Sequence, residues 1–198
     1  MLTLPPAISI VSLDHGFAGD PRRLLLPGDL WTTAIAAKDM MAAIPTGAVM
    51  AVVIRAAREE DRHDLGALKL RSSLAWGDHV EELQALPEAR EVPAVHLPQV
   101  IVAEFAGALA GFATVLPGKD AVRAELEDLF VAPELWRKGI GRSLLAEAEH
   151  RAAALGARSL HVVAGERARP FYEAAGYRFA GTIATDLAPA VELEKELP

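Results

Sequence analysis

The sequence predicts a mixed α/β protein built on one central β-sheet. Two observations lead to this prediction: runs of β-branched or alternating apolar residues recur at strand length, and amphipathic segments of helical period lie between them. Glycine and proline separate these segments along most of the chain. The expected order is one strand, two helices, three antiparallel strands, a helix, a strand, a helix and two last strands. This amounts to about six to seven strands flanked by about four helices.

Bulk composition agrees with one folded domain and narrows the function. Of the 198 residues, 52% are hydrophobic and 24% are charged, which is the balance of a globular protein. The net charge of −7 disfavours a nucleic-acid partner, because such a partner requires a basic face. The chain has no cysteine, and its histidines lack metal-ligand spacing, so we expect no metal. The sequence contains no run of about 18 apolar residues that would predict a membrane span, and no secretory signal is apparent. We therefore expect a cytoplasmic protein.

The beginning of the chain differs in character from the rest. Residues 1–49 contain scattered proline and glycine without strong periodicity. From Met50 onward, MAVVIRAA predicts a strand, and a polar helix start follows it. We therefore expect residues 1–49 to be an N-terminal extension, either a loose arm or the product of a mis-assigned start. Residues 50–198 are expected to form the functional domain.

Two helices and a hairpin are expected after the first strand. The segment from Glu60 to Ala75 predicts an amphipathic helix, and a second, polar helix is expected from Asp78 to Ala89. Apolar runs on both sides of Ala106-Gly107 predict a tight antiparallel hairpin, because a two-residue loop with glycine suits such a turn.

The next strand, within RAELEDLFVAP, is expected to alternate strictly between its two faces. A period of two puts Leu126, Asp128 and Phe130 on one face and Glu127, Leu129 and Val131 on the other. A helix is then expected from Gly139 to Leu155, closed by Gly156 as a left-handed cap.

The segment between this strand and the helix has the composition of a phosphate-binding loop. Its glycines let a ligand approach the backbone, and the first N–H groups of the helix point toward an anion. Cations flank the glycines in a chain that is acidic overall. The pattern predicts a pyrophosphate site made by Arg137, Lys138, Gly139, Ile140, Gly141, Arg142 and Ser143. A tight turn with solvated cations is the alternative, whereas the glycine spacing fits neither a Walker loop nor a Rossmann site.

Three sequence words, ELEDLFVAP, RKGIGRSLL and ARPFYEAAGY, resemble in this order the GNAT superfamily of N-acetyltransferases. The resemblance extends from about Val52 to the C-terminus. It implies a splayed mixed sheet whose fourth strand offers backbone groups, here those of Leu129, Phe130 and Val131, to the pantetheine arm of acetyl-CoA. It also implies that the loop from Arg137 to Ser143 holds the pyrophosphate.

The chain departs from the family's pattern at two positions. Trp136 stands three residues before the first glycine, where glutamine or arginine is usual, so Arg137 and Lys138 would supply that charge. Gly165 stands seven residues before the tyrosine of the FYEAAG helix, where the family often has asparagine. Both departures concern cofactor affinity rather than the fold.

Direct acyl transfer needs a base for the amine and an acid for the departing thiolate. Tyr172 is the predicted acid, because relatives that use a tyrosine carry it in this Phe-Tyr word. Glu127 is one candidate base, since its strand face lies where the acetyl group is expected. His161 on the following strand is the other, because imidazole titrates in the useful range. A packing tyrosine, a solvated carboxylate and a core histidine are the alternative interpretations.

The sequence thus predicts transfer of an acetyl group from acetyl-CoA to a primary amine of a small molecule, peptide or protein. A CoA-binding sensor without turnover and an enzyme that acetylates aminoacyl-tRNA are the alternatives. Residues that choose the acceptor are expected in Glu60–Ala89 and near Ala184–Ala190, where motif content is lowest. We also expect that the late strands can pair between subunits in a homodimer.

Overall fold

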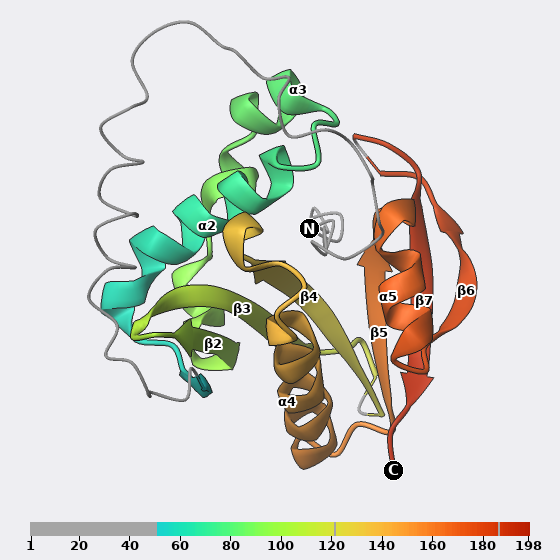
Figure 1. Cartoon of the computed structure of the whole chain (residues 1–198). Coiled ribbons are helices and arrows are strands. Elements are labelled where there is room, and N and C mark those ends of the chain that lie inside the picture. Colours follow the sequence, from blue (N-terminus) through green and yellow to red (C-terminus); the bar gives the residue numbers. More distant parts are fainter. Residues whose placement is uncertain (1–50, 121, 186) are drawn as a thin grey trace, which may run out of the picture. The chain divides into compact units, whose positions relative to one another are not determined.

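The computed structural model describes residues 51–120, 122–185 and 187–198. The expected extension, residues 1–49, lies outside the described residues. The described part confirms the predicted class: it forms a seven-stranded mixed sheet with four α-helices (Figure 1).

The strands follow the order β1-β2-β3-β4-β5-β7-β6 across the sheet. Every neighbouring pair is antiparallel except β4 and β5, which run parallel. The last strand, β7, lies between β5 and β6, so the final hairpin places its second strand inside the sheet. The strands are β1 (Val52–Ala56), β2 (Val100–Phe105), β3 (Ala108–Pro117), β4 (Arg123–Val131), β5 (Ser159–Ala164), β6 (Arg178–Ile183) and β7 (Ala190–Glu196).

The helices lie close to the expected segments, with one shortened. The α-helices are α2 (Arg62–Leu74), α3 (Val80–Ala85), α4 (Ile140–Ala154) and α5 (Arg169–Ala174). Short 3-10 turns join the regular elements at Glu59–Asp61, Pro87–Arg90, Ala94–Gln99, Pro133–Leu135 and Glu166–Ala168. The second predicted helix ends early because Leu86, which precedes a proline, takes an extended conformation with ψ 118°.

Two apolar cores lie on opposite faces of the sheet. On one face, α4 packs mainly against β3 and β4, and α5 packs against β6 and β7, in a core that includes Ile140, Leu144 and Leu160. On the other face, α2 packs against β2, β3 and β4 through residues such as Leu65 and Phe112. The sheet is therefore covered by α4 and α5 on one face and by α2 on the other.

Two turns match the local sequence signals. Ala106 and Gly107 both have positive φ, 53° and 78°, as in a type I′ hairpin turn, and Phe105 pairs with Ala108 across it. Gly156 has φ 87° and ends α4 in the left-handed conformation. Both turns position the strands that follow them.

Candidate active site

The central strands β4 and β5 separate part-way along their length. They pair in parallel register only over Arg123–Leu126 and Ser159–Val162. Beyond these residues, β5 continues beside β7 and β4 continues beside β3, so the two strands diverge toward their carboxyl ends (Figure 1). We call the stretch Glu127–Val131 of β4 the open edge, because it lies beyond the pairing with β5.

A β-bulge at Glu127 accounts for the divergence. Thr114 of β3 lies opposite Asp128, and the next residue, Val115, lies opposite Leu126, so Glu127 is the extra residue of the bulge. A bulge bends its strand and increases the local twist. Here it turns the carboxyl half of β4 away from β5.

The bulge also corrects the strict alternation predicted for this strand. The sequence predicts Leu126 on the face of Asp128 and Phe130, but Leu126 packs in the same core as Leu129 and Val131. Phe130 packs in the other core, on the side of α2. The prediction is wrong for Leu126 because a period of two does not continue across an inserted residue.

Along the open edge, Leu129 and Val131 turn their backbone groups away from β3. The N–H of Ala132 donates to the carbonyl of Ala110 on β3 at 2.8 Å. Residues bonded in this way alternate along an antiparallel ladder, so Phe130 directs its backbone groups to β3. Of the three residues predicted to contact pantetheine, Leu129 and Val131 therefore direct their backbone groups into the break between β4 and β5, whereas Phe130 directs its backbone groups to β3.

The carbonyl of Val131 already accepts two hydrogen bonds. The Ser72 hydroxyl on α2 donates to it at 3.1 Å, and the indole N–H of Trp136 donates at 2.9 Å. A ligand at this residue would therefore use the Val131 N–H. Trp136, which replaces the polar residue usual in the family, fixes the end of the open edge instead of supplying charge.

The loop between β4 and α4 is exposed at the residues directly before the helix, where an anion would have to approach the helix N-terminus. Arg137, Lys138 and Gly139 are exposed, and Gly139 precedes α4 with φ 80°. A Cβ at Gly139 would meet no described atom within 4 Å, so the surface before the helix is open. The N–H groups of the first helical turn lack acceptors within the helix and carry the positive end of its dipole.

The other predicted members of this loop are placed differently. Arg142 is exposed, whereas Ile140 is buried in the core and Gly141 is also buried. The Ser143 hydroxyl donates to the Gly139 carbonyl at 3.3 Å. Arg142 can thus contribute charge, while Ile140 and Gly141 can contribute only backbone groups.

The two cations before Gly139 have defined conformations. Arg137 has φ 66°, a left-handed conformation that costs a residue with a side chain about 1–2 kcal/mol. The ammonium of Lys138 lies 5.3 Å from the ring centroid of Phe105, at the end of β2. An exposed cation–π contact contributes only about 0.5–1 kcal/mol, so a phosphate can displace it.

Tyr172 is buried on the α4 side of the sheet. It is 0% exposed, and its ring lies 5.1 Å from that of Phe171 and 5.3 Å from that of Tyr177. Burial raises the pKa of Tyr177 far above its ordinary value, and the nearby Glu149 carboxylate raises it further. Tyr177 is therefore a neutral phenol beside the predicted acid.

His161 points to the opposite face of the sheet, where it contacts two carboxylates. Its Nδ1 lies 2.5 Å from Glu125 Oε2, and its Nε2 lies 3.5 Å from Glu192 Oε1. Burial raises the pKa of Glu125, but the hydrogen bond and charge of His161, together with Arg123, outweigh it and hold that pKa below its ordinary value. The ionised Glu125 orients the imidazole. No sequence pattern indicates Glu125, since its contact with His161 depends on the β4–β5 register.

The candidate bases gather where β4 leaves β5. Glu127 is half-buried at the bulge, two residues after Glu125 and its partner His161. Tyr172 belongs to the core on the other side of the sheet. The structure thus puts the base candidates near the start of the open edge and the acid candidate across the sheet from His161.

A buried ion pair holds α2 beside the open edge. Lys69 Nζ lies 3.0 Å from Asp128 Oδ1, and the two side chains are 10% and 3% exposed. The same ammonium lies 5.8 Å from the ring centroid of Phe130. Together with the bond from Ser72 to Val131, this pair fixes the carboxyl end of α2.

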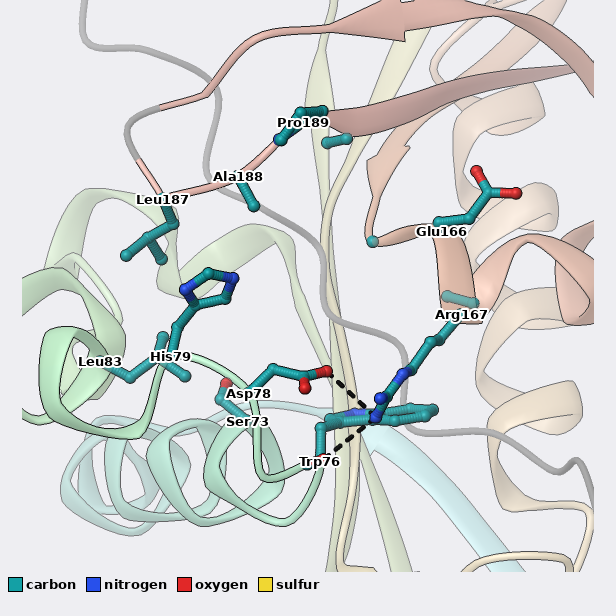
Figure 2. A pocket seen from close by; sticks show the side chains of 13 residues that line it. Ser73, Trp76, Asp78, His79, Leu83, Glu166, Arg167, Leu187, Ala188 and Pro189 are labelled. Carbon is teal, nitrogen blue, oxygen red and sulfur yellow. Dashed lines mark hydrogen bonds and ion pairs between the residues drawn. The ribbon is translucent and has the colours of Figure 1, made fainter. Parts of the chain in front are cut away.

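A cavity of about 270 Å³ lies beside the carboxyl end of α2 (Figure 2). It draws on both segments that the sequence singled out for acceptor choice, Glu60–Ala89 and Ala184–Ala190. A third segment, Gly165–Ala168, also lines it, although no motif indicated this. Its wall combines apolar and charged side chains, among them Trp76, Leu83, Leu187, Asp78, His79 and Arg167.

Arg167 connects two sides of this cavity. Its Nη1 donates to the Trp76 carbonyl at 3.1 Å and lies 3.0 Å from Asp78 Oδ2 (Figure 2). The Trp76 ring packs in turn against Trp136, with centroids 5.5 Å apart. Two indoles therefore link the cavity to the loop that precedes α4.

Comparison with known families decides the assignment. A model of the Acetyltransferase (GNAT) family matches residues 68–177, more than half of the chain, and this range contains the open edge, the Gly139 loop and α5. The chain belongs to the GNAT family. It is an N-acetyltransferase by family, and a search of curated proteins found no match.

Solved GNAT structures share its fold. A GCN5-related N-acetyltransferase from Rhodopseudomonas palustris is 25% identical, with a TM-score of 0.61 over 76% of this chain and 99% of that one. The PaiA N-acetyltransferase from Thermoplasma acidophilum, in complex with coenzyme A, is 22% identical, with a TM-score of 0.58 over 74% and 99%. N-acetylglutamate synthase from Neisseria gonorrhoeae, with coenzyme A and N-acetyl-glutamate, is 22% identical, with a TM-score of 0.56 over 75% of this chain. This GNAT chain spans only 35% of that synthase.

Two further findings describe this GNAT domain. Within residues 51–120, 122–185 and 187–198, no helix is long and apolar enough to cross a membrane. The same residues contain no group of three or more histidine, cysteine, aspartate or glutamate side chains placed to hold a metal ion.

Proposed function

We propose that this GNAT enzyme transfers an acetyl group from acetyl-CoA to a primary amine bound in the cavity beside Trp76 and Arg167. One observation carries the proposal: of the two strands that diverge, β4 leads into the exposed Gly139 loop, and β5 leads into Gly165–Ala168, which line the cavity. A thioester held along the break would be reached by an amine from the cavity.

The residues present fit the pyrophosphate and the pantetheine arm of acetyl-CoA. The helix start at Gly139 and the charges of Arg137, Lys138 and Arg142 suit a pyrophosphate. The backbone groups of Leu129 and the Val131 N–H suit the amides of pantetheine, as in the pairing of an added strand. Relatives from Thermoplasma acidophilum and Neisseria gonorrhoeae complexed with coenzyme A support this assignment.

In the proposed reaction, the amine nitrogen bonds to the acetyl carbon and the carbon–sulfur bond breaks. Glu127, or His161 oriented by Glu125, takes the proton that the amine loses. Tyr172 donates a proton to the departing thiolate.

Thiol release from acetyl-CoA, measured over a panel of amines, tests the proposal. Tyr172→Phe should lower kcat by about 10²-fold or more while leaving the KM for acetyl-CoA unchanged, because only a proton donor is lost. Tyr177→Phe is the matched control, since it removes the same atom from a buried neighbour 5.3 Å away. Equal losses in both variants would assign Tyr172 to packing, and no amine-dependent thiol release in the wild type would overturn the function.

The same assay separates the two candidate bases. The true base should give a variant, Glu127→Gln or His161→Gln, in which the acid limb of the pH–rate profile disappears. If His161 is the base, Glu125→Gln should also lower kcat, because the carboxylate that orients the imidazole is lost. A profile unchanged in all three variants would place the base elsewhere.

A further inference from the structure

We infer that Arg167 binds the carboxylate of the acceptor, and that the acceptors of this enzyme are free amino acids with apolar side chains. The inference rests on the proposed function and names the substrate class of its cavity. It starts from the position of one guanidinium and from the weakness of the contacts that hold it.

Arg167 is the cation that the cavity offers to a ligand. Among the described residues that line the cavity, it is the only arginine or lysine. Figure 2 shows its side chain reaching from the β5–α5 turn toward Asp78 and Trp76 on the α2–α3 side. A planar guanidinium at such a place recognises a carboxylate through two parallel N–H groups.

The present contacts of Arg167 leave this mode of binding open. Its bonds to Asp78 and to the Trp76 carbonyl both use Nη1. The guanidinium carbon also lies 6.0 Å from the centroid of the Trp76 ring. Both polar contacts use one terminal nitrogen, so a carboxylate that replaces Asp78 can bind the guanidinium through two N–H groups.

Asp78 occupies a place that a ligand carboxylate can take. The side chains of Arg167 and Asp78 are 60% and 51% exposed, so water screens their attraction and the pair is easily opened. The ion pair spans the cavity, from the β5–α5 turn to the α2–α3 turn. An acceptor carboxylate can take the place of Asp78 beside Arg167, and the displaced Asp78 side chain is exposed enough to be solvated.

The remaining wall selects the rest of the acceptor. Trp76, Leu83 and Leu187 are apolar and suit an apolar side chain. The volume of about 270 Å³ is small for a ligand site, where about 300–1,000 Å³ is usual, and it suits a free amino acid. Ala168, which follows Arg167, packs in the same core as Tyr172, and the inference places the α-amine of the acceptor on the side of Tyr172.

Matched pairs of acceptors test the inference: leucine against 3-methylbutylamine, and phenylalanine against 2-phenylethylamine. Each amine lacks only the carboxylate. We expect the wild type to acetylate the amino acid with a kcat/KM about 10- to 100-fold higher than the amine, as one charged hydrogen-bonded pair provides. Arg167→Gln should abolish this preference, because it should lower the kcat/KM for the amino acid about 10- to 100-fold more than the kcat/KM for the amine.

Two further variants sharpen the result. Asp78→Asn should lower the KM for leucine more than the KM for 3-methylbutylamine, because only leucine carries a carboxylate that competes with Asp78. Arg169→Gln, a change in the next turn at a residue paired with Glu173, should alter neither value. Equal use of amino acid and amine by the wild type, or equal losses for both in Arg167→Gln, would show that Arg167 is a structural brace. The absence of acetylation with every amine tested would instead overturn the proposed function.

Discussion

Removing one member of the Lys69–Asp128 pair should destabilise the enzyme more than removing both. The charged atoms lie 3.0 Å apart with side chains 10% and 3% exposed, so Lys69→Met leaves a buried carboxylate without its counter-charge. Such a change costs about 3–5 kcal/mol, a large part of the roughly 5–15 kcal/mol that stabilises a typical domain. At about 2–4 °C of Tm per kcal/mol for a chain of this size, Lys69→Met and Asp128→Asn should each lower Tm by roughly 6–20 °C.

The double variant Lys69→Met/Asp128→Asn removes both charges and keeps the side chains close in size. The new amide would lie opposite Thr114 on β3, whose buried hydroxyl has no hydrogen-bond partner in the described part of the chain. We expect the double variant to be more stable than either single variant, with a coupling energy of about 2 kcal/mol or more. Urea unfolding of the four proteins measures this energy directly.

A control pair shows whether burial is the cause. Arg62 and Glu59 also form an ion pair, at 2.6 Å, but their side chains are 35% and 70% exposed. The same cycle there should give a coupling below about 1 kcal/mol. Simple additivity at Lys69 and Asp128 would refute the reasoning, because it would mean that the two buried charges do not stabilise each other.

Three other substitutions test local features. Gly139→Ala should weaken coenzyme A binding in calorimetry yet cost only about 1–2 kcal/mol in urea unfolding, because φ 80° disfavours a Cβ that otherwise meets no described atom within 4 Å. Glu125→Gln should flatten the loss of stability in acid. The pKa of Glu125 is lower in the folded protein than its ordinary value of 4.5, so the ionised carboxylate stabilises the fold at a pH above 4.5. This stabilisation is lost as the pH falls through the folded-state pKa. Equal slopes of stability against pH for the wild type and the variant would contradict this. Ala106→Asn should raise the free energy of unfolding by about 0.5–1 kcal/mol, since asparagine tolerates the φ of 53° in this turn; a decrease would show that Ala106 is not strained.

Features that depend on neighbouring residues could be predicted from the sequence. The hairpin at Ala106-Gly107 and the helix end at Gly156 follow from the φ values that these short turns require. The exposed glycine before α4 follows in the same way. Strand and helix order was predictable for a similar reason, because the apolar period within each segment already indicates its type.

Features that join distant segments could not be predicted. The bulge at Glu127 is defined by the register of β3 against β4, and the pair of His161 with Glu125 depends on the parallel pairing of β4 with β5. A buried Lys69 gives no signal of its own, since lysine is mostly exposed in proteins. The cavity escaped prediction in part because Arg167 reaches a loop 91 residues earlier in the chain.

The bulge at Glu127 leaves an open edge in the middle of the sheet, where backbone groups are normally hydrogen-bonded to a neighbouring strand. Unpaired strand edges can bind other extended chains, and proteins usually cover or interrupt them for that reason. In this enzyme the open edge is short, and the proposed function places the pantetheine arm of acetyl-CoA along it. Extended peptide mimics that carry backbone amides but no thioester should therefore compete for it, and they offer a starting point for designing inhibitors.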